Sequence, residues 1–199
     1  MLVRLAALGW IVAAAVMSGF WAWQRRRPDP GIPMAIWPAL VGALAVLYAN
    51  LGNGEWARRS AIAWMMGSWG ARLAVQEMYT RAAHPAQNSA GSRPLWFLQA
   101  LAAAAMIASL PALLASLNPQ PTLSIVELVA CGLWVVGFAG ETTADRQRLR
   151  YSTNPANQGL RCRTGLWRYA DRPDRLFEGI IWLAFAMFGL AAVWPSQVA

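Results

Sequence analysis

Six apolar stretches run through the chain of 199 residues, and each is close to the roughly 20 residues that a helix needs to cross a membrane. Hydrophobic residues make up 57% of the sequence and charged residues only 13%, against roughly 25% charged in an average soluble domain. The sequence therefore predicts an all-α fold, a polytopic helical bundle of about six transmembrane helices. The stretches cover about residues 2–23, 32–51, 61–80, 95–117, 122–141 and 176–194.

We expect these helices to form a single membrane domain over residues 1–199, without a separate soluble domain. Residues 1–60 would supply an N-terminal helical pair and residues 61–141 the central helices. Residues 142–199 would supply a long loop of the kind that binds a cofactor, followed by the last helix. Connections between the other stretches are short, whereas the loop before the last helix is long and has its own aromatic residues. Long loops with anchoring side chains are usually functional.

The distribution of arginine predicts the topology. Thirteen of the 17 basic residues, all arginines, fall in three segments between apolar stretches, at about 24–31, 81–94 and 142–175. The positive-inside rule assigns such segments to the cytoplasm. We therefore expect an integral membrane protein, of a bacterial inner membrane, with residues 142–175 cytoplasmic and both termini outside.

Several classes of site are not expected. The net charge of +8 comes mainly from loop arginines, without a basic patch interleaved with aromatics, so nucleic acid is not an expected partner. His84 is the only histidine, and Cys131 and Cys162 lack the paired spacing of a zinc site, so no metal site is expected. The sequence has no G-x-G-x-x-G and no Walker motif, so a nucleotide would have to bind without those scaffolds.

The segment over residues 142–175 has the side chains that an anionic cofactor would need. Its arginines present forks that match phosphate oxygens. Asn157 offers an amide for a ribose or a carboxamide, and Trp167 and Tyr169 offer rings that could stack on a base. The alternative is that the arginines only set the topology and contact anionic lipid headgroups. The eight arginines are Arg146, Arg148, Arg150, Arg161, Arg163, Arg168, Arg172 and Arg175.

Three acidic residues lie near predicted membrane edges. An ionisable side chain there is costly unless it is paired, so Asp145 and Glu178 are either partners in structural ion pairs or functional groups. Glu178 is the sharper functional candidate, because Leu176, Phe177 and Ile180 surround it in the sequence. Glu127 has no evident partner in the sequence, and no role is expected for it.

Residues 140–182, GETTADRQRLRYSTNPANQGLRCRTGLWRYADRPDRLFEGIIW, resemble the C-terminal signature of the DUF1295 / steroid 5-alpha-reductase-like membrane proteins. That signature has an acid and an Asp-x-Gln closing a helix, then an aromatic residue, P-A-N-x-G, T-G-L-W-R-Y-S-R-H-P-N-Y and a Glu. The upstream WGARLA is similar to the W-G-x-R-L segment of the family. The matching positions are Glu141, Asp145, Gln147, Tyr151, Pro155, Ala156, Asn157, Gly159, Thr164, Gly165, Leu166, Trp167, Arg168, Tyr169, Pro173 and Glu178.

The resemblance implies a membrane reductase that uses NADPH to reduce a carbon–carbon double bond in an enone-type lipid or sterol-like small molecule. It implies cofactor contacts in the loop and the last helix but identifies no catalytic residue. The oxygen of an enone would need a hydrogen-bond donor as charge develops on it. The resemblance and the side chains of the loop together give the expected cofactor-binding residues. These are Asp145, Arg148, Asn157, Arg168, Tyr169, Arg172 and Glu178.

The sequence departs from the family pattern at its most polar positions. The R-H-P-N-Y core reads Asp171-Arg172-Pro173-Asp174-Arg175, so Asp174 carries a negative charge where an amide is usual. That charge would repel a phosphate unless Arg172 or Arg175 screens it. The family's acidic G-E-D-x-R-Y motif is replaced by HPAQNSAGSRP at 84–94, and the sequence ends at Ala199, before the family's further helix and basic tail.

Two other functions therefore stay open. The chain could be a non-catalytic relative that binds lipid or assembles with a partner membrane protein. It could also be a lipid or isoprenoid methyltransferase that uses S-adenosylmethionine, because those enzymes share a related C-terminal module. S-Adenosylmethionine lacks the 2′-phosphate of NADPH, so the number of loop arginines favours NADPH.

Overall fold

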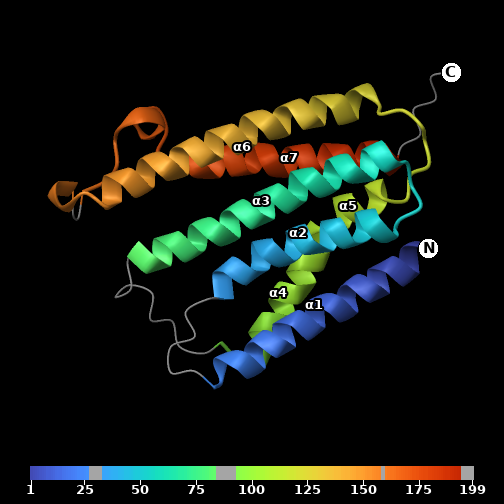
Figure 1. Ribbon diagram of the computed structural model, residues 1–199. Helices are drawn as coiled ribbons and strands as arrows, with labels where there is room; N and C mark the ends of the chain where they lie inside the picture. Colours follow the sequence, from blue (N-terminus) through green and yellow to red (C-terminus); the bar gives the residue numbers. More distant parts are fainter. Residues whose placement is uncertain (27–32, 84–92, 158–159, 194–199) are drawn as a thin grey trace. The chain divides into compact units, whose positions relative to one another are not determined.

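The computed structural model describes residues 1–26, 33–83, 93–157 and 160–193, and within these ranges the chain is helical without strands (Figure 1). The predicted fold class, an all-α helical membrane bundle, is confirmed. The elements are α1 (Leu2–Gln24), α2 (Pro33–Leu51), α3 (Trp56–Ala83), α4 (Leu95–Ala108), α5 (Leu110–Ala115), α6 (Ile125–Ser152), the 3-10 turns η2 (Pro155–Asn157) and η3 (Gly165–Arg168), and α7 (Pro173–Val193).

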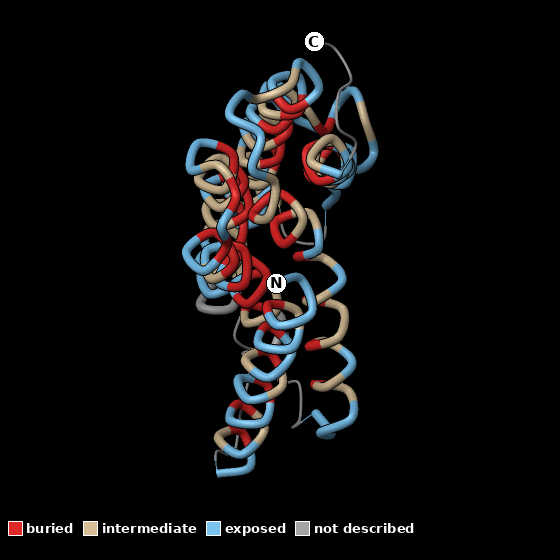
Figure 2. Tube along the Cα trace, turned by 90° about the vertical axis from the view of Figure 1, so that its right-hand side faces the viewer, coloured by how far each residue is buried: buried red, intermediate tan, exposed pale blue. Residues whose placement is uncertain are grey.

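Three of the described helices, α1, α6 and α7, are long and apolar enough to cross a membrane. The sequence predicted about six such helices. The apolar parts of α2 and α4, Ala35–Leu51 and Leu95–Ala108, are shorter than a full span. The buried residues of α1 recur every three or four positions, and much of its remaining surface is exposed (Figure 2). Leu8, Trp10 and Ile11 are on that exposed surface, as expected for a helix in contact with lipid.

The predicted fourth stretch, over residues 95–117, is divided between α4 and α5. The division falls at Ser109, just before Pro111 in the first turn of α5. Proline has no N–H for the helical hydrogen bond, and its ring clashes with the preceding turn. The helix therefore ends and restarts at this point.

The chain divides into two compact units, residues 1–123 with 189–199 and residues 124–188. The predicted single membrane domain stays a prediction. In the first unit, α2 and α3 lie side by side and antiparallel (Figure 1). Gly42 permits their close approach because it has no side chain. A Cβ at this position would lie only 3.1 Å from the carbonyl oxygen of Met66.

Two consecutive arginines of α3 join that helix to the end of α2 and to the segment between α5 and α6. Arg58 is buried, and its guanidinium donates hydrogen bonds to the carbonyls of Gln120 (2.7 Å) and Thr122 (2.6 Å). Arg59 donates to the carbonyl oxygens of Ala49 (3.0 Å) and Gly52 (2.9 Å). Arg58 thus satisfies carbonyls of the segment between α5 and α6, and Arg59 satisfies carbonyls at the end of α2.

In the second unit, α6 packs closely against α7 through glycine. A Cβ on Gly137 would lie 2.8 Å from Cγ1 of Ile181, and one on Gly140 would overlap the ring of Phe177. The start of α6 gives Glu127 a role that the sequence analysis did not assign. The Ser124 backbone N–H donates to Glu127 Oε2 (2.7 Å), and the Glu127 N–H donates to Ser124 Oγ (3.2 Å), which is a capping box.

The end of α6 corrects the boundary of the long loop. The sequence predicted a loop over residues 142–175, but residues 142–152 continue α6 and residues 173–175 begin α7. Only residues 153–172 lie between the two helices. Because Gln, Arg and Leu are good helix formers, the charged residues after position 144 extend the helix beyond its apolar part.

Candidate functional site

The candidate site is built on the last turns of α6 and the loop that follows. The side-chain oxygen Oε1 of Gln147 accepts a hydrogen bond from the backbone N–H of Leu166 at 2.9 Å. Gly165, just before it, has φ +59°, a left-handed conformation that favours glycine. A Cβ there would lie 2.5 Å from Gln147 Oε1. The conformation of Gly165 thus allows the loop to lie directly on α6.

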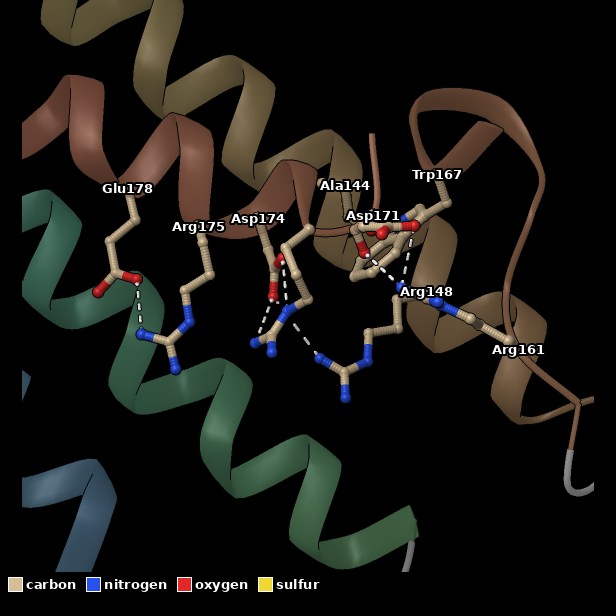
Figure 3. Close-up of polar contacts among 9 residues, drawn as sticks. Ala144, Arg148, Arg161, Trp167, Asp171, Asp174, Arg175 and Glu178 are labelled. Atoms are coloured by element: carbon tan, nitrogen blue, oxygen red, sulfur yellow. Dashed lines mark hydrogen bonds and ion pairs between the residues drawn. The ribbon is translucent and has the colours of Figure 1, made fainter. Parts of the chain in front are cut away.

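Trp167 anchors the loop from η3. Its indole Nε1–H donates to the carbonyl oxygen of Ala144 at 3.0 Å, and the residue is only 9% exposed. The guanidinium carbon of Arg148 lies 5.7 Å from the centre of the Trp167 ring (Figure 3), within the range of a cation–π contact. The indole that the sequence suggested for stacking on a base therefore holds the loop to the helix.

An open pocket of about 830 Å³ lies in this loop. Arg161 is paired with Asp171, with Nη2 and Oδ1 3.1 Å apart. In the part of the chain that the structure describes, Arg163 and Arg168 have no carboxylate partner. The pocket therefore keeps net positive charge. Its lining residues are Arg161, Arg163, Trp167, Arg168, Tyr169, Ala170 and Asp171.

An aromatic ring is also available at this pocket. The Tyr169 residue is 85% exposed, whereas Trp167 is buried. An exposed ring beside two guanidinium groups suits a ligand that carries both an anionic group and a planar group.

The altered core around Asp174 forms an ion-pair network (Figure 3). Arg172 Nε lies 3.4 Å from Oδ1 of Asp174, and Arg148 Nη1 lies 3.7 Å from its Oδ2. The side chain of Asp174 is 13% exposed. Two cations thus screen the charge that would otherwise repel a phosphate. Arg172 is one of the two arginines that the sequence suggested for this task, and the other, Arg175, instead pairs with Glu178 at 3.2 Å.

The structure brings only two of the expected cofactor-binding residues to the pocket. Arg168 and Tyr169 line the pocket, whereas Arg148, Arg172 and Glu178 belong to ion pairs. The amide Nδ2 of Asn157 donates to the carbonyl of Tyr151 at 3.1 Å and so closes the turn after α6. Asp145 is partly buried on α6, three residues before Arg148.

Five of the lining residues were not among the seven expected cofactor contacts: Arg161, Arg163, Trp167, Ala170 and Asp171. The sequence does contain a signal for the first two. Arg161 and Arg163 flank Cys162 and come just before Thr164 and Gly165, where the loop contacts α6. Among the described residues there is no group of three or more His, Cys, Asp or Glu side chains that could hold a metal ion.

The family model described as "Protein of unknown function (DUF1295)" matches residues 20–198. No curated protein and no solved structure matches the chain. The matched range includes α2 to α7 with the loop and its pocket.

Proposed function

The chain belongs to the DUF1295 family, and from this premise we propose that it is an NADPH-dependent membrane reductase of carbon–carbon double bonds in an enone-type lipid or sterol-like substrate. The likeness of residues 140–182 to the steroid 5-alpha-reductase-like signature suggests the reaction. The observation that carries the cofactor assignment is the pocket in which Arg163 and Arg168 lack carboxylate partners within the described chain.

The residues of the pocket fit the chemistry of the cofactor. Guanidinium groups bind phosphate oxygens through paired N–H donors, so Arg163 and Arg168 would hold phosphate groups. The exposed ring of Tyr169 would contact a base or nicotinamide ring. NADPH, when bound, supplies the hydride, while the protein contributes binding and orientation.

The position of the pocket suits a substrate that is dissolved in the bilayer. The loop joins the end of α6 to the start of α7, two helices apolar enough to span a membrane. A polar cofactor in the loop would thus face water on the predicted cytoplasmic side, while a lipid could approach along the apolar helices. A donor for the enone oxygen would still be required, and we assign no residue to that role.

A second function, a non-catalytic relative that binds lipid or a partner membrane protein, is favoured by a different observation. Arg148, Arg172 and Glu178 are already paired within the chain. Side chains that satisfy one another need no ligand to balance their charge. A methyltransferase using S-adenosylmethionine is less well supported, because that cofactor needs fewer cations than the pocket offers.

The test is a fluorescence titration of detergent-purified protein with NADPH, with NADH and S-adenosylmethionine as competitors. A charged hydrogen bond contributes about 1.5–3 kcal/mol, so Arg163→Ala and Arg168→Ala should each weaken NADPH binding about tenfold or more. Arg175→Ala is the matched control, because Arg175 does not line the pocket and pairs with Glu178. Folded protein that binds none of the three compounds would overturn the reductase proposal in favour of the second function.

A further inference from the structure

A second hollow, separate in sequence from the loop pocket, lies along the hairpin of α2 and α3 in the first unit. It has a volume of about 950 Å³. The two helices lie antiparallel (Figure 1), and half of the residues that line the groove are alanine or glycine. Among these lining residues are Ala39, Gly42, Ala43, Ala63 and Gly67.

The edge of the groove is aromatic and exposed. Trp56 and Trp64 line it, and they are 69% and 72% exposed. With the small residues beside them, these two exposed indoles give the groove a mainly apolar lining.

Two polar side chains of the groove are bonded within their own helices. The amide of Asn50 donates to the Val46 carbonyl at 2.8 Å, and the hydroxyl of Ser68 donates to the Trp64 carbonyl at 2.6 Å. These two groups therefore offer little to a ligand. The charged residue of the lining is Arg59.

The guanidinium of Arg59 has one side fixed and one side available. Its Nη1 donates to the carbonyls of Ala49 and Gly52, which fixes the orientation of the group. Its Nε is buried and has no hydrogen-bond acceptor, so the charge of the group is only partly compensated within the protein. Within the described chain its Nη2 has no acceptor either, and Nη2 is not among the buried atoms. An oxyanion beside Nη2 would accept a charge-assisted hydrogen bond and balance the charge, so Nη2 indicates an oxyanion ligand.

The length of the groove indicates the rest of the ligand. From Ala39 to Asn50, α2 advances eleven residues, or about 17 Å at about 1.5 Å per residue. That is close to half of the roughly 30 Å hydrocarbon core of a bilayer, which is the depth of one leaflet. A ligand that fits would have one anionic group at one end and an apolar chain as long as a leaflet is deep.

We propose that this groove is a binding site for one membrane phospholipid, with an acyl chain along α2 and α3 and the phosphate on Nη2 of Arg59. The single positive charge at one end of an apolar channel is complementary to a phosphodiester attached to a hydrocarbon chain. The site does not depend on the loop pocket or on NADPH, and the phospholipid is a bound lipid rather than the substrate of the proposed reductase.

The proposal is tested by native mass spectrometry of the full chain in detergent, after incubation with dioleoylphosphatidylglycerol. The wild type should keep one phospholipid per chain through a detergent wash. Ala63→Phe fills the groove one helical turn from Arg59 and keeps the arginine, so it should lower the retained lipid about tenfold, the factor that follows from losing about 1.4 kcal/mol of binding. Arg59→Lys keeps the charge but lacks the planar group that Nη1 holds in place, so it should also lower the retention.

The matched control is Ala15→Phe, the same substitution at an exposed alanine of α1 outside the groove. It should retain lipid as the wild type does. Equal retention by Ala63→Phe, Ala15→Phe and the wild type would overturn the proposal, even if Arg59→Lys failed to fold. Displacement of the lipid by inorganic phosphate alone would overturn it too, since the acyl channel would then have no part in binding. NADPH affinity, measured in parallel, should be unchanged in Ala63→Phe, so failure here is distinguishable from failure of the reductase proposal.

Discussion

Gln147 and Leu166 are nineteen residues apart in the sequence and are joined by a hydrogen bond of 2.9 Å between the Gln147 side-chain oxygen and the Leu166 backbone N–H. This bond fixes the start of η3 on the last turns of α6. The same segment carries Arg168 and Tyr169, which line the loop pocket. The geometry of the candidate site therefore depends on a contact between two residues that do not themselves line the pocket.

Gly165→Ala should loosen the loop. The new Cβ would lie 2.5 Å from Gln147 Oε1 at a residue with φ +59°, and a left-handed conformation costs an L-residue about 1–2 kcal/mol. We expect faster proteolytic cleavage within residues 153–172 and weaker NADPH binding. The control is Gly179→Ala, where an added Cβ meets nothing within 4 Å. Identical cleavage rates for the two variants would show that Gly165 is not needed for the loop conformation.

Trp167→Phe should destabilise the second unit. The substitution keeps an aromatic ring but removes the N–H that donates to the Ala144 carbonyl. The loss of such a bond costs about 0.5–1.5 kcal/mol, and more where an acceptor is left buried. Thermal unfolding in detergent should show a lower midpoint than that of Trp96→Phe, a control at an indole that is 71% exposed. An equal midpoint for both variants would contradict an anchoring role for Trp167.

The sequence was sufficient for the class of the fold but not for the ends of its helices. Apolar composition predicts helices in a membrane because the bilayer leaves no other partner for backbone polar groups. It does not mark where a helix continues into water, so the polar residues 145–152 read as part of the loop although they extend α6. The capping box of Ser124 and Glu127 has its own signal in the spacing of the two residues, which apolar composition does not contain.

The candidate site was predictable as a region and not as a set of contacts. The motif residues Gln147 and Gly165 mark the place where the loop meets α6. Each acidic residue has several arginines near it in the sequence. The path of the loop between Gln147 and Gly165 therefore decides which arginines form ion pairs and which do not. Composition alone did not distinguish Arg168, in the pocket, from Arg172, which pairs with Asp174.

Asp174→Asn should increase the affinity for NADPH if the loop binds its phosphates. The change removes the charge that holds Arg148 and Arg172, and it leaves two more cations available to an anionic ligand. These arginines are more than half exposed, and exposed pairs contribute about 0–1 kcal/mol to stability, so the unfolding midpoint should change little.

The readout for Asp174→Asn is the dissociation constant of NADPH at low and high salt. The variant should bind more tightly than the wild type, and its affinity should fall more steeply as salt screens the added positive charge. Asp174→Glu keeps the negative charge and should behave as the wild type. An affinity that is lower in Asp174→Asn than in Asp174→Glu would mean that the ion-pair network itself organises the site.

Gly140→Ala should disrupt the packing of α6 on α7. The added methyl group would overlap the ring of Phe177, and overpacking a close helix contact costs about 1–3 kcal/mol. Gly132→Ala, in the same helix, meets nothing within 4 Å and should be neutral or slightly stabilising, because alanine favours a helix over glycine by about 1 kcal/mol.

The assignment of this effect to Phe177 is tested by a double variant. Phe177→Leu removes the ring that Gly140→Ala would strike, so the pair should recover much of the stability that Gly140→Ala loses, as thermal unfolding in detergent would show. Residues in direct contact give such non-additive effects, whereas distant residues give additive ones. Additive losses in the double variant would therefore mean that the Gly140 position is not in contact with Phe177, and the described packing of α6 on α7 would be wrong.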